Sequence, residues 1–149
     1  MSLSTQKVFY QALLADTDVM TATDGRIYSV AIPVPDEDLD NEPVPYCVIT
    51  FDGLANSGFT KDNSFEGDID TVNIGIEITA ESPDALLELA EKVRTAVISF
   101  FENYTPTPGE EDLTPLIPNS YTFGASQSVY DPDKPCFRIV LTYACDTTP

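Results

Sequence analysis

One segment of the sequence, residues 68–101, constrains the fold more than any other, because a strand pattern runs directly into a helix pattern. Apolar residues alternate with polar or small ones from position 72 to position 80, the period-two pattern of a strand with one buried face. A helix is expected to follow at once. Ser82 suits the N-cap, Pro83 suits the first helical position, and Asp84 complements the positive end of the helix dipole.

The expected helix, residues 83–101, carries a wider apolar surface than one sheet needs. Leu87 and Ile98 extend its buried stripe past Arg94, so the apolar arc spans roughly 200°, whereas a simple surface helix needs only about 100°. The extra width predicts a second contact. That contact is either the first helix of the same chain or a neighbouring subunit.

The rest of the chain predicts one further helix and several strands. Residues 4–15 read as a short amphipathic helix that Ser4 can cap, and residues 16–23 add at most one helical turn. Strand patterns occupy residues 26–32, 46–51, 120–130 and 137–143, and the last two predict a hairpin. This order predicts an α+β fold: a mostly antiparallel sheet of about four or five strands, with one long and one short helix packed on one face.

The chain length predicts a single domain over residues 1–149. With 149 residues, of which 42% are hydrophobic, there is material for one core and too little for two. Sections rich in proline, glycine and acidic residues interrupt the strand and helix patterns. They predict irregular loops at residues 33–45, 53–67 and 105–119.

The charge of the chain restricts its partners. The sequence has 25 acidic and 7 basic residues and no histidine, which gives a formal net charge of −18. Such a surface repels phosphates, so sequence-specific binding to nucleic acid is not expected, whereas a conduit that nucleic acid passes through is compatible with it. No apolar run has the length of a membrane span, so no membrane partner is expected. Three cysteines without a C-x-x-C pair favour a reducing cytoplasm.

The sequence predicts no catalytic residue, no cofactor-binding residue and no metal ligand. Without histidine there is no Ser-His-Asp triad or Cys-His dyad, and the glycine-rich motifs that bind phosphates or dinucleotides are missing as well. The acidic loop at residues 36–42 lacks the spacing of a calcium loop. Carboxylates at residues 110–112 lie in a proline-rich loop, where nothing apolar raises a pKa, and Glu77 lies on the polar face of a strand. We therefore expect a protein that is not an enzyme.

Aromatic residues in the loop at 53–67 are candidates for contact with another molecule. Phe59 and Phe65 flank Lys61 in an otherwise polar segment. They either fold back onto the sheet or anchor a second subunit. Together with Leu87 and Ile98, these three residues form the predicted subunit interface.

Several short motifs give the chain a resemblance to a known family. Gly25-Arg26-Ile27-Tyr28 is followed by a proline-bearing connection, then by Pro45-Tyr46-Cys47-Val48-Ile49, a variable loop, the alternating strand that ends at Ile78-Thr79-Ala80, the helix from Pro83 and a final hairpin. This order resembles the small tail-completion proteins of long-tailed phages and prophages, which include tail terminators and head-tail joining proteins. The likeness covers nearly the whole chain.

The resemblance implies a structural subunit without enzymatic activity. Such subunits assemble with copies of themselves, commonly as a hexameric ring, and contact tail tube or head connector proteins. The implied location is the host cytoplasm during assembly and then the virion tail. Two other functions remain open from the residues: a small monomeric module that binds a ligand or a protein, and an enzyme that uses carboxylates alone. A pocket with buried carboxylates favours these, whereas flat apolar edges favour assembly.

Overall fold

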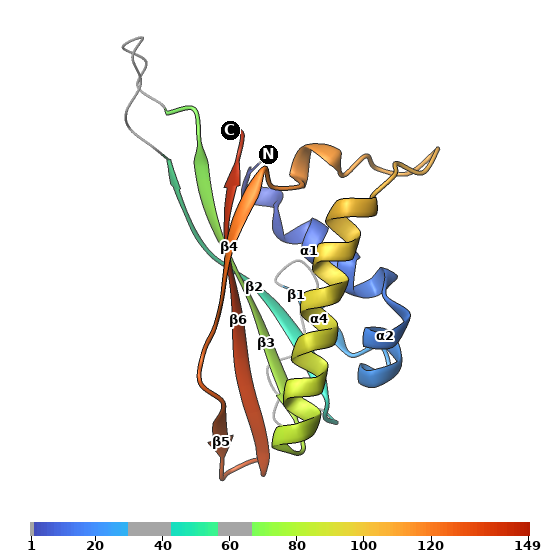
Figure 1. Ribbon diagram of the computed structural model, residues 1–149, viewed down its shortest axis with the longest axis vertical. Helices are drawn as coiled ribbons and strands as arrows, with labels where there is room; N and C mark the ends of the chain where they lie inside the picture. The colour runs from blue at the N-terminus through green and yellow to red at the C-terminus, as the bar shows by residue number, and fades with distance from the viewer. Residues whose placement is uncertain (1, 30–42, 57–66) are drawn as a thin grey trace.

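A computed structural model of the protein describes residues 2–29, 43–56 and 67–149 (Figure 1). Its helices are η1 (Ser2–Ser4), α1 (Gln6–Ala15), α2 (Thr17–Thr23), α4 (Pro83–Asn103) and η2 (Thr114–Leu116). Its strands are β1 (Ile27–Ser29), β2 (Tyr46–Asn56), β3 (Asp70–Ala80), β4 (Ser120–Ala125), β5 (Val129–Asp131) and β6 (Cys136–Thr147). The predicted α+β class is confirmed.

The described strands form one sheet in the order β1-β2-β3-β6-β4, and β5 pairs with β6 beyond the end of β4. β1 is parallel to β2, and the other pairs are antiparallel. The sheet has six strands because the segment expected as one strand at 120–130 is divided. Ser126 interrupts it: its N–H donates to the carbonyl of Val140 at 2.9 Å, and its hydroxyl accepts from the N–H of Val140 at 3.0 Å.

The three α-helices lie on one side of the sheet (Figure 1). β3 occupies the middle of the sheet, and its apolar residues Val72, Ile74, Ile76 and Ile78 are all fully buried. Leu86, Val93 and Val97 of α4 and Phe9 and Leu13 of α1 complete the core from the helical side. The alternation in β3 therefore predicts its buried face correctly.

The start of α4 is also as predicted. The Ser82 hydroxyl accepts a hydrogen bond from the N–H of Ala85 at 3.1 Å, and Pro83 opens the helix. The two short helices differ from expectation. Ser4 does not cap α1, because residues Ser2–Ser4 form a separate 3-10 turn and Thr5 precedes the helix without a side-chain cap. Residues 17–23 form a seven-residue helix rather than a single turn, because Asp16 caps it by accepting from the N–H of Val19.

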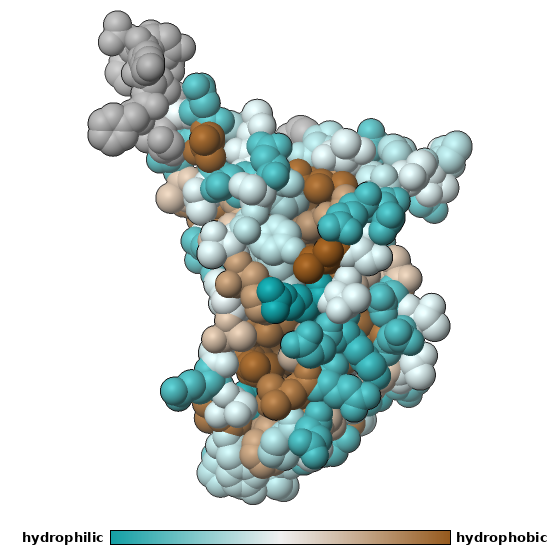
Figure 2. All heavy atoms as spheres, in the orientation of Figure 1, coloured by the Kyte–Doolittle hydropathy of each residue, from teal (hydrophilic) through white to brown (hydrophobic). Residues whose placement is uncertain are grey.

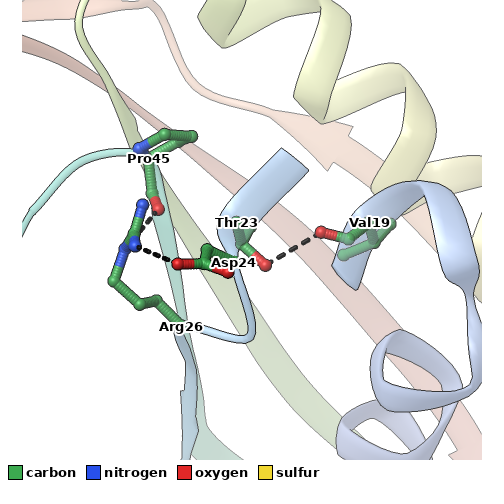
Figure 3. A network of polar contacts seen from close by, with 5 residues as sticks. All are labelled: Val19, Thr23, Asp24, Arg26 and Pro45. Atoms are coloured by element: carbon green, nitrogen blue, oxygen red, sulfur yellow. Dashed lines mark hydrogen bonds and ion pairs between the residues drawn. The ribbon is translucent and has the colours of Figure 1, made fainter. Parts of the chain in front are cut away.

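The two short motifs that carry the family resemblance lie beside each other at the end of α2 (Figure 3). α2 ends at Thr23, and Asp24, which caps it, has a left-handed φ of 51°. The guanidinium of Arg26 then donates from Nε to the carbonyl of Pro45 at 3.1 Å and lies 3.6 Å from the Asp24 carboxylate. Ile27, the first residue of β1, is in register with Cys47 of β2. These motifs therefore fix the parallel pairing of β1 and β2, which is a structural role.

Candidate subunit interface

The predicted interface residues fall into two groups. Phe59, Lys61 and Phe65 lie outside the described residues. Leu87 and Ile98 lie on α4, where Leu87 is 53% exposed and Ile98 is half-buried. With 3.6 residues per turn, Leu87, Arg94 and Ile98 share one flank of the helix, within an arc of roughly 40°.

This flank of α4 faces β4. The guanidinium carbon of Arg94 lies 4.1 Å from the centre of the Phe123 ring, which places the charge over the aromatic face. One turn beyond Ile98, the ring of Phe101 lies 6.1 Å from that of Tyr121. We call the surface formed by Leu87, Arg94, Ile98 and Phe123 the α4–β4 shelf. The sequence singled out two of its four members.

The other flank of α4 packs against the amino-terminal helices. Ala96 and Ser99 line a groove together with Tyr10 of α1, and Ala96 is buried. The first helix thus accounts for part of the extra apolar width of α4. At the end of the helix, Phe101 also contacts Phe9 of α1 at 5.3 Å between ring centres. Leu87 is more than half exposed in the isolated subunit, so α1 does not account for it.

A cluster of aromatic rings around Tyr143 packs against Phe123 of the shelf. Tyr143 of β6 is fully buried, and its ring lies 5.0 Å from that of Phe9, 5.2 Å from that of Tyr121 and 5.2 Å from that of Phe123. Burial raises the pKa of Tyr121, and the positive charge of Arg94 opposes this rise. Arg94 therefore lies close to the cluster as a whole. These aromatic contacts fix Phe123 beneath the guanidinium.

Apolar surface continues toward the far end of the sheet. Tyr130 of β5 is 51% exposed, and its ring lies 5.1 Å from that of Phe137. Val129 is 61% exposed as well, but it is in register with Arg138 and so lies on the sheet side opposite the helices. Figure 2 shows apolar side chains, in brown, gathered between α4 and the sheet in the lower half of the visible face. Single exposed apolar residues are ordinary, but a contiguous group suggests a contact surface.

The carboxylates do not form a catalytic arrangement in the part of the chain that the structure describes. The hydrogen bonds from Thr114 lower the pKa of Asp112, whereas a general acid needs a raised pKa. Glu77 faces solvent on the sheet side opposite the helices and lies 3.8 Å from Nε of Arg138. Across residues 2–29, 43–56 and 67–149, no three His, Cys, Asp or Glu side chains come together as a metal site would require. None of the described helices is long and apolar enough to cross a membrane.

One open groove is large enough for a ligand. It has a volume of about 880 Å³ and lies between α1, the end of α4 and the irregular residues 104–113. Lys7, Tyr10, Phe100 and Tyr104 are among its lining residues, and Lys7 lies 3.8 Å from Glu111 across it. The Tyr104 hydroxyl accepts a hydrogen bond from the N–H of Leu113 at 2.9 Å, which holds the irregular segment in place.

Comparisons with known proteins identify the fold. No protein-family model matches the chain, and no curated protein does so. Among solved structures, a chain from the "Virion of native gene transfer agent (GTA) particle" is similar, with a TM-score of 0.60 and 16% sequence identity. The match covers 97% of this chain and 94% of the virion chain. The protein thus has, over almost its full length, the fold of a virion component. At this identity the likeness shows the fold alone.

Sequence reasoning missed Arg94 and Phe123 as interface candidates. A signal for Arg94 exists in the sequence, since a basic residue interrupts a wide apolar arc in a chain with only 7 basic residues. Phe123 has no such signal, because its position under Arg94 depends on how β4 pairs with β6.

Proposed function

We propose that the protein is a structural, non-enzymatic subunit of a phage or prophage tail that assembles with copies of itself as a ring at the tail end or at the head-tail junction. The observation that carries this proposal is the near full-length fold likeness to a virion chain. The order of short motifs, which resembles that of tail-completion proteins, supports it independently. The ring is expected to be hexameric, as is common in that family.

The charge of the chain suits such a ring. Each chain has a net charge of −18, so the wall of a central channel is expected to repel DNA phosphates. DNA would then pass through the ring without binding to it. The partners in this proposal are other copies of the chain and the tail tube or head connector proteins. The protein is then assembled in the bacterial cytoplasm and carried in the virion tail.

Assembly is tested with the purified chain at high concentration. Light scattering measures the mass of the particles. Negative-stain electron microscopy, with and without tail tubes of the parent phage or prophage, shows whether rings form and whether they cap the tubes. We expect rings, capped tubes or both. A chain that remains monomeric and never binds a tube contradicts the proposed function.

Two leucines provide a matched test of the predicted interface. Leu87 is 53% exposed on the α4–β4 shelf, and Leu3 is 66% exposed in η1 near the chain termini. Replacing Leu87 with serine is expected to weaken assembly, because it removes apolar surface from the contact, whereas Leu3→Ser is expected to leave assembly unchanged. Equal effects of the two substitutions would show that the Leu87 flank has no special part in the contact.

The groove between α1 and residues 104–113 favours a second candidate, a monomeric binding module. Its lining combines three aromatic rings with amides, one lysine and the carboxylates of Asp16, Glu110 and Glu111, and so offers a small ligand or a peptide both apolar surface and hydrogen-bonding groups. A monomeric chain that fails to bind tubes, but gains thermal stability from one compound of a small-molecule screen, would favour this candidate. Loss of that gain in Tyr10→Ala would place the ligand in the groove.

A further inference from the structure

The outer edge of the sheet at β4 is open. Among the described strands, β4 pairs with β6 on one side and with nothing on the other. Its sequence, Ser120–Ala125, contains no charged residue and no proline. Edge strands of soluble proteins are usually protected by lysines, prolines or bulges, because their free backbone groups pair readily with another strand.

The hydrogen bond from Ser126 to β6 shows which backbone groups of β4 point outward. The N–H of Ser126 donates to Val140 on β6, and successive residues of a strand direct their backbone groups to opposite sides. The N–H of Ala125 therefore points away from β6 and toward the open edge. Ala125 is also exposed. A further strand could continue the ladder from this position.

Such a strand would lie against the α4–β4 shelf. The side chains of Tyr121, Phe123 and Ala125 face the helical layer, because they are in register with the buried Cys145, Tyr143 and Leu141. The guanidinium of Arg94 lies over the ring of Phe123, and Ala125 is exposed. An adjacent strand, about 4.8 Å farther out, would place its inward side chains beside Phe123 and Arg94.

Charge indicates the composition of that strand. Lys7, Arg26, Lys92 and Arg138 all have carboxylates within ion-pairing distance. No carboxylate of the described residues lies within 4.0 Å of Arg94, and the guanidinium lies over the Phe123 ring instead. An aspartate or glutamate of the incoming strand would complete this site. With 25 acidic residues against 7 basic ones, a second copy of the chain supplies such a residue readily.

We propose that the edge of β4 and the α4–β4 shelf bind an extended, acidic segment of a second copy of this chain, which adds a strand to the sheet and places a carboxylate against Arg94. This inference rests on the proposed assembly and names the contact that holds neighbouring subunits. Arg94 fixes the position of the neighbour by pairing with its carboxylate, while the edge of β4 supplies backbone hydrogen bonds.

The test compares two charge reversals on the same helix. Arg94→Glu places a negative charge on the shelf, and Lys92→Glu makes the same change in net charge two residues away, on the polar side of α4. Sedimentation velocity of the full chain, at about 0.05 M and about 0.5 M NaCl, measures self-association. We expect Arg94→Glu to raise the dissociation constant at least about ten-fold, whereas Lys92→Glu changes it by less than about three-fold.

A second variant examines the strand edge. Ala125→Pro removes the outward N–H without removing a hydrogen bond to β6, and edge strands tolerate proline. It is expected to weaken association to a similar extent as Arg94→Glu. Circular dichroism and thermal unfolding of each variant show whether the fold is retained, and only folded variants are compared.

The outcomes separate this inference from the proposed function. If the wild-type chain forms rings and both Arg94→Glu and Ala125→Pro form them equally well, the contact lies elsewhere and the inference is wrong, while the ring remains. If the wild-type chain is monomeric at every concentration but caps tail tubes, a second copy is not the occupant, and the tail function stands. If Arg94→Glu forms rings but no longer binds tubes, the shelf binds a different virion protein, which also overturns the inference.

Discussion

The hydroxyl of Tyr143 leads to a prediction of unusual sign: replacing this buried residue with phenylalanine should stabilise the protein. Tyr143 lies at the centre of the aromatic cluster and is 0% exposed. Its hydroxyl oxygen has no hydrogen-bond partner among the described residues. Burial accordingly raises the pKa of this group. Phenylalanine keeps the ring and removes only the group that has lost its hydration.

The magnitude follows from two opposing contributions. An unsatisfied buried hydroxyl costs about 1–3 kcal/mol of folding free energy, which the substitution recovers. Removing one oxygen leaves a void of about 12 Å³, and at about 24 cal/mol per Å³ this costs about 0.3 kcal/mol. The net gain is then at least about 0.7 kcal/mol, which corresponds to a rise of roughly 2 °C in Tm for a chain of this size.

Urea unfolding followed by circular dichroism measures this gain. Tyr121→Phe is the control, because Tyr121 belongs to the same cluster but its hydroxyl is not among the buried atoms without a partner. It is expected to change the free energy of unfolding by less than about 0.5 kcal/mol. Tyr143→Leu, which removes the ring contacts, should cost about 2–4 kcal/mol. If Tyr143→Phe lowers stability by 1 kcal/mol or more, the hydroxyl has a hydrogen-bond partner and the reasoning is wrong.

Three further predictions concern stability. Ser82→Ala should lower the free energy of unfolding by about 1 kcal/mol, measured in urea, because the N–H of Ala85 loses its cap. Burial raises the pKa of Cys47 and of Cys145 to about 12, whereas the unfolded chain loses these protons near pH 9. The free energy of unfolding should therefore be constant below about pH 9 and fall as the pH rises toward 12. Cys47→Ala should reduce the steepness of that fall. The hydrogen bond from Asn56 to Asp70 lowers the pKa of Asp70, so the stability that this bond contributes should disappear as the pH falls through that pKa. Acid titration of Asn56→Ala should show a smaller loss of unfolding free energy than that of the wild-type chain.

The parts of the fold that the sequence predicts depend on local signals. The alternation in β3 and the capping residues of α4 each depend on neighbours within a few positions, so the strand, the helix and its first residue are all predictable. α2 is less predictable from the sequence, because a seven-residue helix depends on contacts with α1 and α4 as well as on its own cap. The division of β4 from β5 depends on Ser126 meeting Val140, fourteen residues away.

Gly75 illustrates what a pattern alone does not explain. In the sequence it is a small residue in an alternating strand. In the structure, a Cβ at this position would lie 2.5 Å from Oδ2 of Asp52 and 2.8 Å from Oγ1 of Thr50, because both side chains of β2 fold over it. The need for glycine therefore comes from the neighbouring strand. The register of β2 with β3, including its shift between Phe51 and Gly53, is what creates that need.

The candidate interface has the same division between local and distant causes. The width of the apolar arc on α4 follows from helical periodicity alone, whereas the exposure of Leu87 is visible only in the structure. The pairing of Arg94 with Phe123 joins residues 29 positions apart and requires the sheet order to be known. Periodicity therefore indicates that α4 has a surplus apolar flank, and only the tertiary structure shows that the flank and the open edge of β4 are adjacent.

The salt dependence of self-association bears on how a chain with a charge of −18 binds its own copies. Repulsion between two such chains acts over their whole surfaces, and salt at 0.1 M screens it beyond about 10 Å. An ion pair at Arg94, in contact and partly covered by the added strand, is screened much less. Raising the salt concentration should therefore strengthen association of the wild-type chain, even though one ion pair positions the neighbour. Association that weakens steadily with salt would mean that ion pairs dominate the contact and that the apolar shelf and the strand edge contribute little.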